Sequence, residues 1–347
     1  MRKSVVFKNN HLYYLDQTKL PRFRIYRECR NIKEGYHAIK ELKVRGAPLI
    51  GVFAAYCMCI SARKFKGRKS DFMAYLKDTA LYLSGSRPTA VNLSWAIERI
   101  MRVASKNSNE SVDALKSIIL KEAGRIHRED IRLCANMAKE GLKLIHTNDV
   151  ILTHCNTGFL AASGEGTALA VIYAAAKKYR SIKVYVDETR PLLQGARLSS
   201  WELRESGIDT TLITDNTAAY LMQKKIIDKI LVGADRIAKN GDTANKIGTY
   251  SLAVLAKFHK IPFYVVAPLT SFDINIGKGE YIPIEQRSPD EIRKVLGKVW
   301  IAPEKVKVYN PAFDVTPHKL ITAIVTDKGI IRPPFKRNIK RILTAVR

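Results

Sequence analysis

The chain has 347 residues, of which 59 are Lys or Arg and 32 are Asp or Glu, giving a formal net charge of +27. With 46% hydrophobic residues and 26% charged residues, it carries too much apolar surface for a disordered polyelectrolyte. This length predicts one large domain or two of medium size. The charge leaves four explanations: nucleic acid, an anionic membrane, a phosphorylated substrate, or a general bias of the surface.

The compartment is predicted from apolar segments and cysteines. No stretch near the N-terminus resembles the core of a signal peptide, and none approaches the ~18–20 apolar residues that span a bilayer. The five cysteines are odd in number and contain no CxxC pair, which argues against a disulfide framework or a zinc ribbon. We expect a cytoplasmic protein with reduced thiols and no membrane partner.

Residues 1–146 are expected to form a mainly helical domain. The first twenty residues alternate around Asn9–Asn10, a pair that tolerates the positive φ of a hairpin turn. From Asn31 to about His146 the apolar spacing is helical, with breaks at 45–48, at Gly67 and at 84–88. A long helix near 111–146 ends this domain.

Residues 147–347 alternate strands with helices, which predicts an α/β, doubly wound Rossmann-like domain with a mostly parallel sheet. Ligands of such sheets bind beyond the carboxyl ends of the strands, so polar residues there are the first candidates. The expected strands are 149–153, 182–186, 210–214, 227–232, 262–267 and 323–326, and the expected helices 166–179, 192–206, 216–224 and 245–259.

Cys155 follows the first of these strands, in the sequence His154–Thr157, and precedes a glycine-containing loop. A lone cysteine is usually a buried bystander. At a strand end before a helix, however, backbone N–H groups can bind an anion or stabilise a thiolate. Cys155 is therefore a candidate, whereas the three thiols expected to be structural are Cys57, Cys59 and Cys134.

The next two strand ends are also polar. Asp187, Glu188 and Arg190 either pair with one another or face a ligand, and the sequence leaves both alternatives open. Gln194, near the start of a helix, is suited to hold the hydroxyl groups of a sugar. Asp215–Asn216 is predicted to cap a helix instead of binding a ligand.

Asp235 follows Val232–Ala234, whose apolar character favours the neutral, proton-donating carboxyl of a general acid; the alternative is that Asp235 caps the next turn. Asn245–Lys246 is expected to open a helix, where a cation and N-terminal amides can bind phosphate. Arg45 and Arg87 each precede a helix-starting turn, which is the same pairing of Arg with helix amides.

Several common sites are missing from the sequence. It contains no GxxxxGK[ST] phosphate loop, no GxGxxG fingerprint and no GxSxG elbow. The seven His are scattered, without the spacing of a metal site. We therefore expect neither a nucleotide cofactor nor a resident metal.

Eight motifs, taken together and in order, resemble the methylthioribose-1-phosphate isomerase family: RGAPLIG, SRPTAVNL, ILTHCNTG, DETRPLLQGARL, LITDN, VGADRIAKNGDTANKIGTY, IPFYVVAP and NPAFDVTP. The resemblance runs from about Arg45 to about Thr326. It implies that an aldose 1-phosphate is isomerised to a ketose 1-phosphate in methionine salvage, without a cofactor, by a homodimer. The wider superfamily includes ribose-1,5-bisphosphate isomerases and regulatory subunits of a translation-initiation nucleotide-exchange factor.

By position, the resemblance implies that Cys155 and Asp235 are the catalytic pair. The anomeric phosphate blocks simple ring opening, so Asp235 would protonate the ring oxygen. Hydrogen then moves from C2 to C1, either as a proton carried by Cys155 or as hydride in a desolvated pocket, and the sequence leaves both routes open. The implied substrate contacts are Arg45, Gly46, Ala47, Arg87, Gln194, Asn245 and Lys246.

Three other functions compete with this one. An isomerase of ribose 1,5-bisphosphate or 5-deoxyribose 1-phosphate would use the same motifs, although Cys–Asn–Thr–Gly favours the methylthio branch. A non-catalytic initiation-factor-like subunit would have no reason to keep Cys155 and Asp235. A nucleic-acid binder is disfavoured because the basic residues are not interleaved with aromatics in a recognisable module. The basic tail 332–347 is a surface helix, a dimer extension or an anion-binding tail.

Overall fold

The computed structural model describes residues 3–87 and 90–344. The chain divides into two compact units, a first unit that ends at Leu133 and also includes Phe159–Gly166, and a second unit made of the remainder. The boundary lies inside α5 (Val112–Leu142), so this helix contributes to both units, whereas the sequence places the change of domain near residue 146. No helix among the described residues is long and apolar enough to cross a membrane.

The first unit joins a small antiparallel sheet to helices, as expected. In the turn between its first two strands Asn9 and Asn10 have φ of 50° and 65°, which is the hairpin geometry that the sequence predicts. A third strand, which the sequence analysis misses, extends the hairpin. The elements are β1 (Val5–Lys8), β2 (His11–Leu15), β3 (Tyr26–Cys29), α1 (Ile32–Lys40), α2 (Ala47–Lys64), α3 (Lys69–Ser84), α4 (Val91–Lys106) and the first part of α5.

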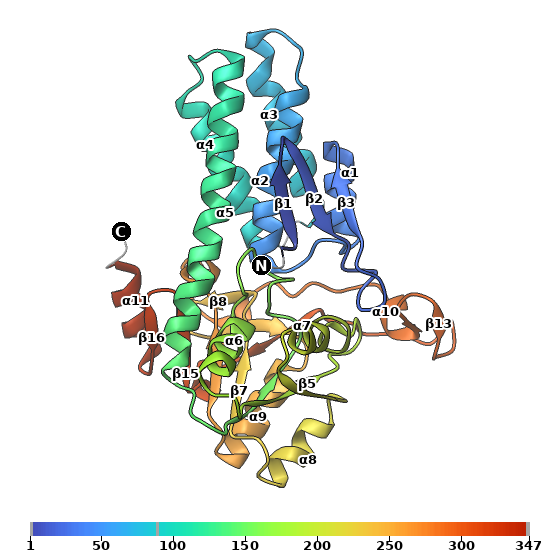
Figure 1. The fold of residues 1–347 in the computed structure, drawn as a ribbon, viewed down its shortest axis with the longest axis vertical. Coiled ribbons are helices and arrows are strands. Elements are labelled where there is room, and N and C mark those ends of the chain that lie inside the picture. Colours follow the sequence, from blue (N-terminus) through green and yellow to red (C-terminus); the bar gives the residue numbers. More distant parts are fainter. Residues whose placement is uncertain (1–2, 88–89, 345–347) are drawn as a thin grey trace. The chain divides into compact units, whose positions relative to one another are not determined.

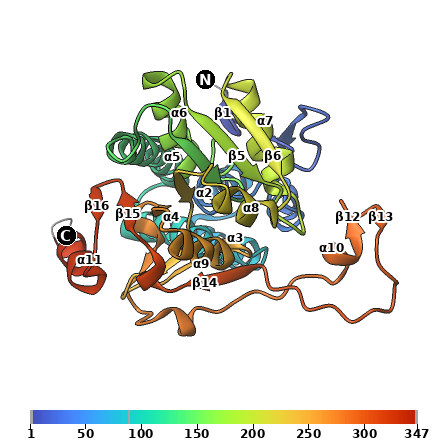
Figure 2. The ribbon, with the colours of Figure 1, turned by 90° about the horizontal axis from the view of Figure 1, so that it is seen from below.

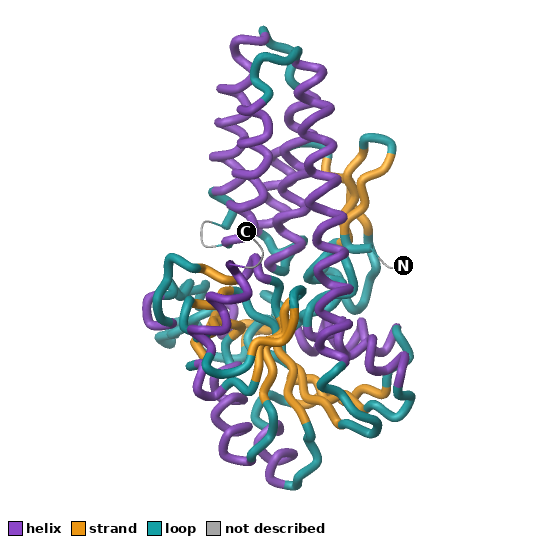
Figure 3. The backbone as a smooth tube through the Cα atoms, turned by 90° about the vertical axis from the view of Figure 1, so that its left-hand side faces the viewer, coloured by secondary structure: helices purple, strands orange, loops and turns teal. Residues whose placement is uncertain are grey.

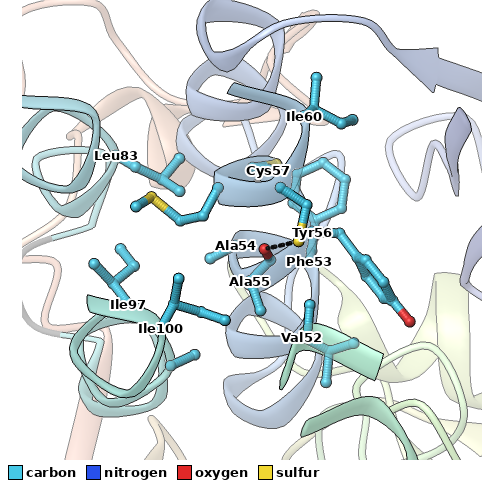
Figure 4. Packing of buried hydrophobic residues seen from close by; sticks show 14 of the residues in the cluster. Val52, Phe53, Ala54, Ala55, Tyr56, Cys57, Ile60, Leu83, Ile97 and Ile100 are labelled. Carbon is cyan, nitrogen blue, oxygen red and sulfur yellow. Dashed lines mark hydrogen bonds between the residues drawn. The ribbon is translucent and has the colours of Figure 1, made fainter. Parts of the chain in front are cut away.

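Helix α2 is the centre of the core of this unit. All residues from Leu49 to Ala62 are buried, as expected for a helix that is apolar on every side. Figure 4 shows its side chains packed against Leu83 of α3 and against Ile97 and Ile100 of α4. The long helices run side by side in Figure 3. This core accounts for the buried Cys57 and Cys59, which confirms their structural role.

The second unit is built on a seven-stranded sheet with the order β16-β15-β10-β7-β4-β5-β6 (Figure 1). Every pair is parallel except β15–β16, which confirms the doubly wound fold. The chain builds outward from β4 through β5 and β6, then returns to β7 on the other side of β4, so the strand order reverses between β4 and β7. The strands are β4 (Val150–Thr153), β5 (Lys183–Asp187), β6 (Asp209–Ile213), β7 (Lys229–Val232), β10 (Phe263–Val266), β15 (Ala323–Thr326) and β16 (Gly329–Ile331).

Helices cover this sheet, and three of them share one apolar cluster with its strands. These are α8 (Thr217–Gln223), α9 (Thr249–His259) and α11 (Phe335–Thr344). Because Phe335 and Ile339 are buried in that cluster, the basic tail is a packed helix up to residue 344. The other helices are α6 (Ala168–Lys178) and α7 (Ser200–Glu205); a π-helical turn, Gly195–Ser199, replaces the start of the helix expected at 192–206.

A second sheet, which the sequence analysis misses, has the order β11-β8-β9-β14. The helix expected at 245–259 is confirmed as α9 except for its start, because Asn245 and Lys246 belong to strand β9 (Thr243–Lys246) and α9 begins only at Thr249. The segment between β11 and β14 forms an arm with short helical and paired elements (Figure 2). The remaining elements are β8 (Arg236–Ala238), β11 (Phe272–Asp273), α10 (Asp290–Arg293), β12 (Lys294–Val295), β13 (Val299–Trp300), β14 (Phe313–Thr316) and the 3-10 turns Leu269–Ser271, Gly279–Tyr281 and His318–Leu320.

Candidate active site

The ends of β4 and β7 bring the loops of Cys155 and Asp235 together. Thr153 of β4 lies opposite Leu231 of β7, and its Oγ1 donates a hydrogen bond to the Leu231 carbonyl at 2.8 Å. The two loops touch beyond these strands, because a Cβ added to Gly233 would lie only 2.7 Å from Cγ2 of Thr157. They therefore meet where the strand order reverses, which is the place where open α/β sheets bind ligands.

Cys155 is held in a strained backbone conformation. Its φ is 61°, in the left-handed region that costs an ordinary L-residue ~1–2 kcal/mol. Its N–H donates to Thr189 Oγ1 at 2.8 Å, and its carbonyl accepts from Ser199 Oγ at 2.7 Å. The residue is buried, with 8% of its surface exposed. Strain of this kind, fixed by neighbours from two other segments, is typical of functional positions.

A buried carboxylate supports the residue that follows Cys155. Glu202, in α7, is fully buried and accepts a hydrogen bond from Asn156 Nδ2 at 2.7 Å and one from Tyr173 Oη at 3.0 Å. Asn156 Nδ2 also donates to Ser199 Oγ at 3.2 Å. The sequence analysis misses Ser199 and Glu202. The feature that indicates Glu202 is a charged residue inside a helix that otherwise packs on the sheet.

His154 and Asp187 form a buried pair. His154 Nδ1 lies 2.9 Å from Asp187 Oδ2, and Nε2 lies 2.8 Å from the carbonyl oxygen of Ile247. Burial by itself lowers the pKa of His154, but the hydrogen bond and the charge of Asp187 outweigh it and raise this pKa. Asp187 thus pairs with His154 and not with Arg190, whose guanidinium donates to the carbonyl groups of Pro191 and Ile292.

Asp215 supports the same region. Its carboxylate accepts the backbone N–H groups of Thr189 at 2.7 Å and Arg190 at 2.8 Å. Asn216 occupies the N-cap position of α8, but its side chain makes no capping hydrogen bond. The predicted N-cap position is therefore confirmed for Asn216, whereas the side-chain capping hydrogen bond is missing, because the Asn216 amide oxygen accepts from Thr214 Oγ1 and Asp215 accepts from the Thr189 and Arg190 amides.

A metal ion has one candidate site among the described residues. Ligand atoms of His154, Asp187 and Asp215 lie within 4.8 Å of one another. In this arrangement both nitrogens of His154 already face hydrogen-bond acceptors, and Asp215 already accepts two amides. His154 is thus hydrogen-bonded to Asp187 and to the Ile247 carbonyl, and Asp215 is hydrogen-bonded to two backbone amides.

Gln194 has an acceptor ready for a ligand. The residue is buried, with 5% exposed, and its Oε1 has no hydrogen-bond partner among the described residues. It directly precedes the π-helical turn Gly195–Ser199. Because buried polar atoms normally have partners, an unpaired acceptor at the edge of this site fits a donating hydroxyl group.

Asn245 and Lys246 end β9 and are both anchored by the protein. Asn245 is buried and donates from Nδ2 to Thr249 Oγ1 at 3.0 Å. Lys246 Nζ donates to the carbonyl of Ala312 at 2.8 Å and lies 4.7 Å from the centre of the Phe313 ring. Strand β8, paired with β9, follows Asp235 directly, and Asp235 N donates to the Ala244 carbonyl at 2.9 Å.

The start of α9 is capped by a carboxylate. Asp314 of β14 accepts the N–H of Gly248 at 2.7 Å and that of Tyr250 at 3.0 Å. Burial raises the pKa of Asp314 to about 6, against the opposing effect of these two hydrogen bonds. Two of the amides at this helix start are therefore occupied by the protein itself, and the phosphate site expected at Asn245–Lys246 stays a prediction.

Four predicted substrate contacts belong to the first unit. Gly46, with φ 96°, caps α2, which begins at Ala47 directly after Arg45 and Gly46, and Leu49 N donates to the Ala161 carbonyl at 3.1 Å. Arg87 precedes α4, as expected, and its carbonyl accepts the N–H of Ala90 at 3.0 Å. Pro88 and Thr89 of the same motif lie outside the described residues. The substrate contacts of Arg45, Gly46, Ala47 and Arg87 stay predictions.

Two curated relatives match almost the whole chain. A methylthioribose-1-phosphate isomerase of Desulforamulus reducens is 50% identical over 340 residues, which are 98% of this chain and 98% of the relative. A 5-deoxyribose 1-phosphate isomerase of Moorella thermoacetica is 48% identical over 340 residues, covering 98% of this chain and 97% of that protein. These relatives bear out the resemblance carried by the eight motifs.

Two solved structures have the same fold. The 5-methylthioribose 1-phosphate isomerase of Pyrococcus horikoshii superposes with a TM-score of 0.93 at 45% identity, covering 99% of this chain and 96% of that one. A chain of A. fulgidus described as translation initiation factor eIF-2B, subunit delta, has a TM-score of 0.89 at 44% identity and covers 99% and 100% of the two chains. Residues 43–333 match the sequence profile of the Initiation factor 2 subunit family, and the chain belongs to this family.

Proposed function

We propose that the chain isomerises 5-methylthioribose 1-phosphate to 5-methylthioribulose 1-phosphate, a step of methionine salvage. The observation that carries this proposal is the placement of Cys155 and Asp235. They follow adjacent parallel strands on the two sides of the point where the strand order reverses, in loops that touch. Relatives about 50% identical over 98% of the chain carry the name of this activity.

The reaction needs an acid first. The phosphate on C1 prevents simple opening of the ring, so Asp235 gives its proton to the ring oxygen as the bond between C1 and that oxygen breaks. A hydrogen then moves from C2 to C1, while the hydroxyl proton on C2 returns to the Asp235 carboxylate and the ketone forms. Asp235 thereby regains the proton that it gave to the ring oxygen, and no external oxidant or reductant is required.

The hydrogen moves from C2 to C1 by one of two routes, and Cys155 carries it in the first. In the first, its thiolate removes the C2 proton and delivers it to C1 through an enol phosphate; in the second, hydride moves directly from C2 to C1 in the closed pocket. Turnover in D2O tests the first route, because only exchange through the thiol places deuterium at C1 of the product. Protium at C1 is the result of hydride transfer and also of a buried thiol that returns the same proton before it exchanges with solvent.

The remaining contacts divide between the sugar and its phosphate. Gln194 Oε1, an unpaired buried acceptor, takes a sugar hydroxyl. The family resemblance implies that the phosphate is held by Arg45, Arg87, Asn245 and Lys246. It implies Gly46 and Ala47 as further substrate contacts. We also propose the homodimer that the family resemblance implies, which analytical ultracentrifugation tests.

The test uses the purified chain with methylthioribose 1-phosphate, 5-deoxyribose 1-phosphate and ribose 1,5-bisphosphate. The highest kcat/KM is expected for the first, and a higher value for 5-deoxyribose 1-phosphate would move the chain to the activity of its Moorella relative. No turnover of any of the three would favour the non-catalytic class, represented by the name of the A. fulgidus chain.

Two variants test the catalytic pair against matched controls. Cys155→Ser and Asp235→Asn should each abolish turnover while substrate binding, followed by calorimetry, persists. Cys59→Ser changes a buried thiol in the core of the first unit and keeps a donor to the Ala55 carbonyl, so full activity is expected. Asp228→Asn changes a carboxylate just before β7 begins, and it should also turn over normally. Normal turnover in either catalytic variant contradicts the mechanism.

A further inference from the structure

The buried His154 ring connects three segments that carry proposed site residues. It directly precedes Cys155 at the end of β4, and its Nδ1 contacts Asp187 at the end of β5. Its Nε2 contacts the carbonyl of Ile247, directly after Asn245–Lys246. A Cβ on Gly248 would lie 2.9 Å from Cε1 of this ring, so the imidazole fills the space beside the start of α9.

While Asp187 is a carboxylate, both contacts of the ring require a proton on nitrogen; a protonated Asp187, which burial favours by raising the pKa of this carboxyl, would instead donate to a neutral ring. A carboxylate oxygen and a backbone carbonyl are acceptors, and a neutral imidazole has only one N–H to offer. It would therefore point a lone pair at one of the two oxygens, whereas the imidazolium donates to both. The ring is 1% exposed, and a buried cation is tolerated only when it is paired in this way.

The charged groups around His154 favour the cation. Asp187 lies at the end of β5, Asp215 follows β6, and Asp314 comes from β14. All three are acidic. The imidazolium is therefore surrounded by carboxylates that lie on three strands or directly after them.

The end of β5 also holds the Cys155 backbone. Thr189 Oγ1 accepts the Cys155 N–H at 2.8 Å and donates to the Asp187 carbonyl at 3.1 Å. Cys155 is thus tied to the Asp187 segment twice, once through the side chain of His154 and once through Thr189. A displacement of Asp187 would therefore also displace Cys155, both through His154 and through Thr189.

We propose that His154 is a positioning residue for the isomerisation, acting as an imidazolium that Asp187 orients and that fixes Cys155 relative to Asn245–Gly248. This inference rests on the proposed function, because its main readout is turnover of methylthioribose 1-phosphate. His154 and Asp187 need not touch the substrate in this role. Their effect is on the geometry and the charge of the residues that do.

The test compares Asp187→Asn and His154→Gln with the wild-type enzyme. Each variant should lose ~100-fold or more in kcat, because a small misplacement of a reacting group has effects of this size, while KM changes by less than ~3-fold. Asp187→Glu restores a carboxylate and should recover part of the lost kcat.

The pH profile distinguishes positioning from simple support of the fold. In Asp187→Asn the imidazolium loses its counter-ion and burial then lowers the pKa of His154, so the residual kcat should fall as pH rises through this lowered pKa. The wild-type enzyme should show no such loss there. A profile of Asp187→Asn that is parallel to wild type contradicts the proposal.

Asp149→Asn is the matched control. Asp149 is a buried carboxylate of the same unit that pairs with Lys229, and it precedes β4 at the end opposite to Cys155. Its loss should lower Tm but leave kcat within ~3-fold. If Asp187→Asn and His154→Gln lower Tm in the same way and also keep kcat, His154 is only structural.

Nitrogen NMR of the wild-type ring gives an answer that does not depend on activity or on the folding of Asp187→Asn. Both ring nitrogens of His154 should stay protonated at pH 8, with the resonances assigned by their loss in His154→Gln. A neutral ring at pH 8 overturns the proposal. Absence of turnover in the wild-type enzyme would instead contradict the proposed function and leave the NMR result to decide the state of His154.

Discussion

Gly233 allows a direct test of the contact between the loops of Cys155 and Asp235. A Cβ at this position would lie 2.7 Å from Thr157 Cγ2 and 3.4 Å from Thr167 Oγ1. Ordinary contact begins near 3.4 Å. Gly233→Ala therefore drives the Thr157 methyl away by more than half an ångström, with a cost of ~1–3 kcal/mol for overpacking. Since Thr157 and Cys155 share one loop, a loss of ~10–100-fold in kcat is expected.

The assay is a double-mutant cycle on kcat and on the free energy of unfolding. Thr157→Ser removes only Cγ2, the atom that the added methyl group would strike, so the double variant should recover most of the loss of Gly233→Ala, with a coupling of ~1–2 kcal/mol. Gly207→Ala is a control at a position with φ 71° and no atom within 4 Å, where only backbone strain is added. Full activity of Gly233→Ala, or no recovery in the double variant, would refute the contact as the cause.

Three further outcomes are expected. Asp130 is fully buried, burial raises its pKa to about 6, and its carboxylate accepts the Ser163 N–H at 2.6 Å; since the folded state binds this proton more tightly than the unfolded state, stability falls as pH rises from about 4 through 6. Asp130→Asn keeps an acceptor without the charge, so chemical denaturation should show it more stable than wild type at pH 8, by ~1–3 kcal/mol, and equal to it at pH 4. Phe335→Ala should cost ~3–5 kcal/mol in the same assay, because its side chain is 2% exposed in the core shared with α8 and α9, whereas Lys340→Ala on the same helix should change stability by less than ~0.5 kcal/mol. Finally, the net charge of +27 should attract an anionic substrate, so kcat/KM should fall several-fold between low salt and ~0.3 M salt while kcat changes little; a salt-independent kcat/KM would exclude steering.

The sequence predicts well those features that depend on short-range pattern. Strand β4, predicted at 149–153, is Val150–Thr153, and β15, predicted at 323–326, is found there. Once the strands and their parallel order are known, the rule that ligands bind at carboxyl ends places Cys155 and Asp235 in one region. Both residues are candidates on this local reasoning, and their pairing as catalytic groups comes from the family resemblance.

Contacts between distant segments cannot be predicted in the same way. Ser199 and Glu202 are more than forty positions away in the sequence from Cys155 and Asn156, to which they are hydrogen-bonded. No sequence pattern near Cys155 predicts these contacts. The sequence analysis misses strand β9 because Thr243–Lys246 lacks the apolar run of β4 and β15 and takes its stability from pairing with β8 and β14. Tertiary pairing, which single-sequence propensity does not contain, decides these elements.

The strained conformation of Cys155 explains why so many buried polar groups surround a single thiol. Cys155 and Thr189 both have left-handed φ, 61° and 64°, and each such residue costs ~1–2 kcal/mol. One hydrogen bond contributes only ~1 kcal/mol net, so the bond between Cys155 N and Thr189 Oγ1 cannot hold both residues. Ser199 and Asp215 supply the further bonds, one to each residue's backbone. A loop that needs partners from three other segments to keep its shape is specified by the fold as a whole, so the backbone conformation of Cys155 depends on the segments that follow β5 and β6 as much as on its own sequence.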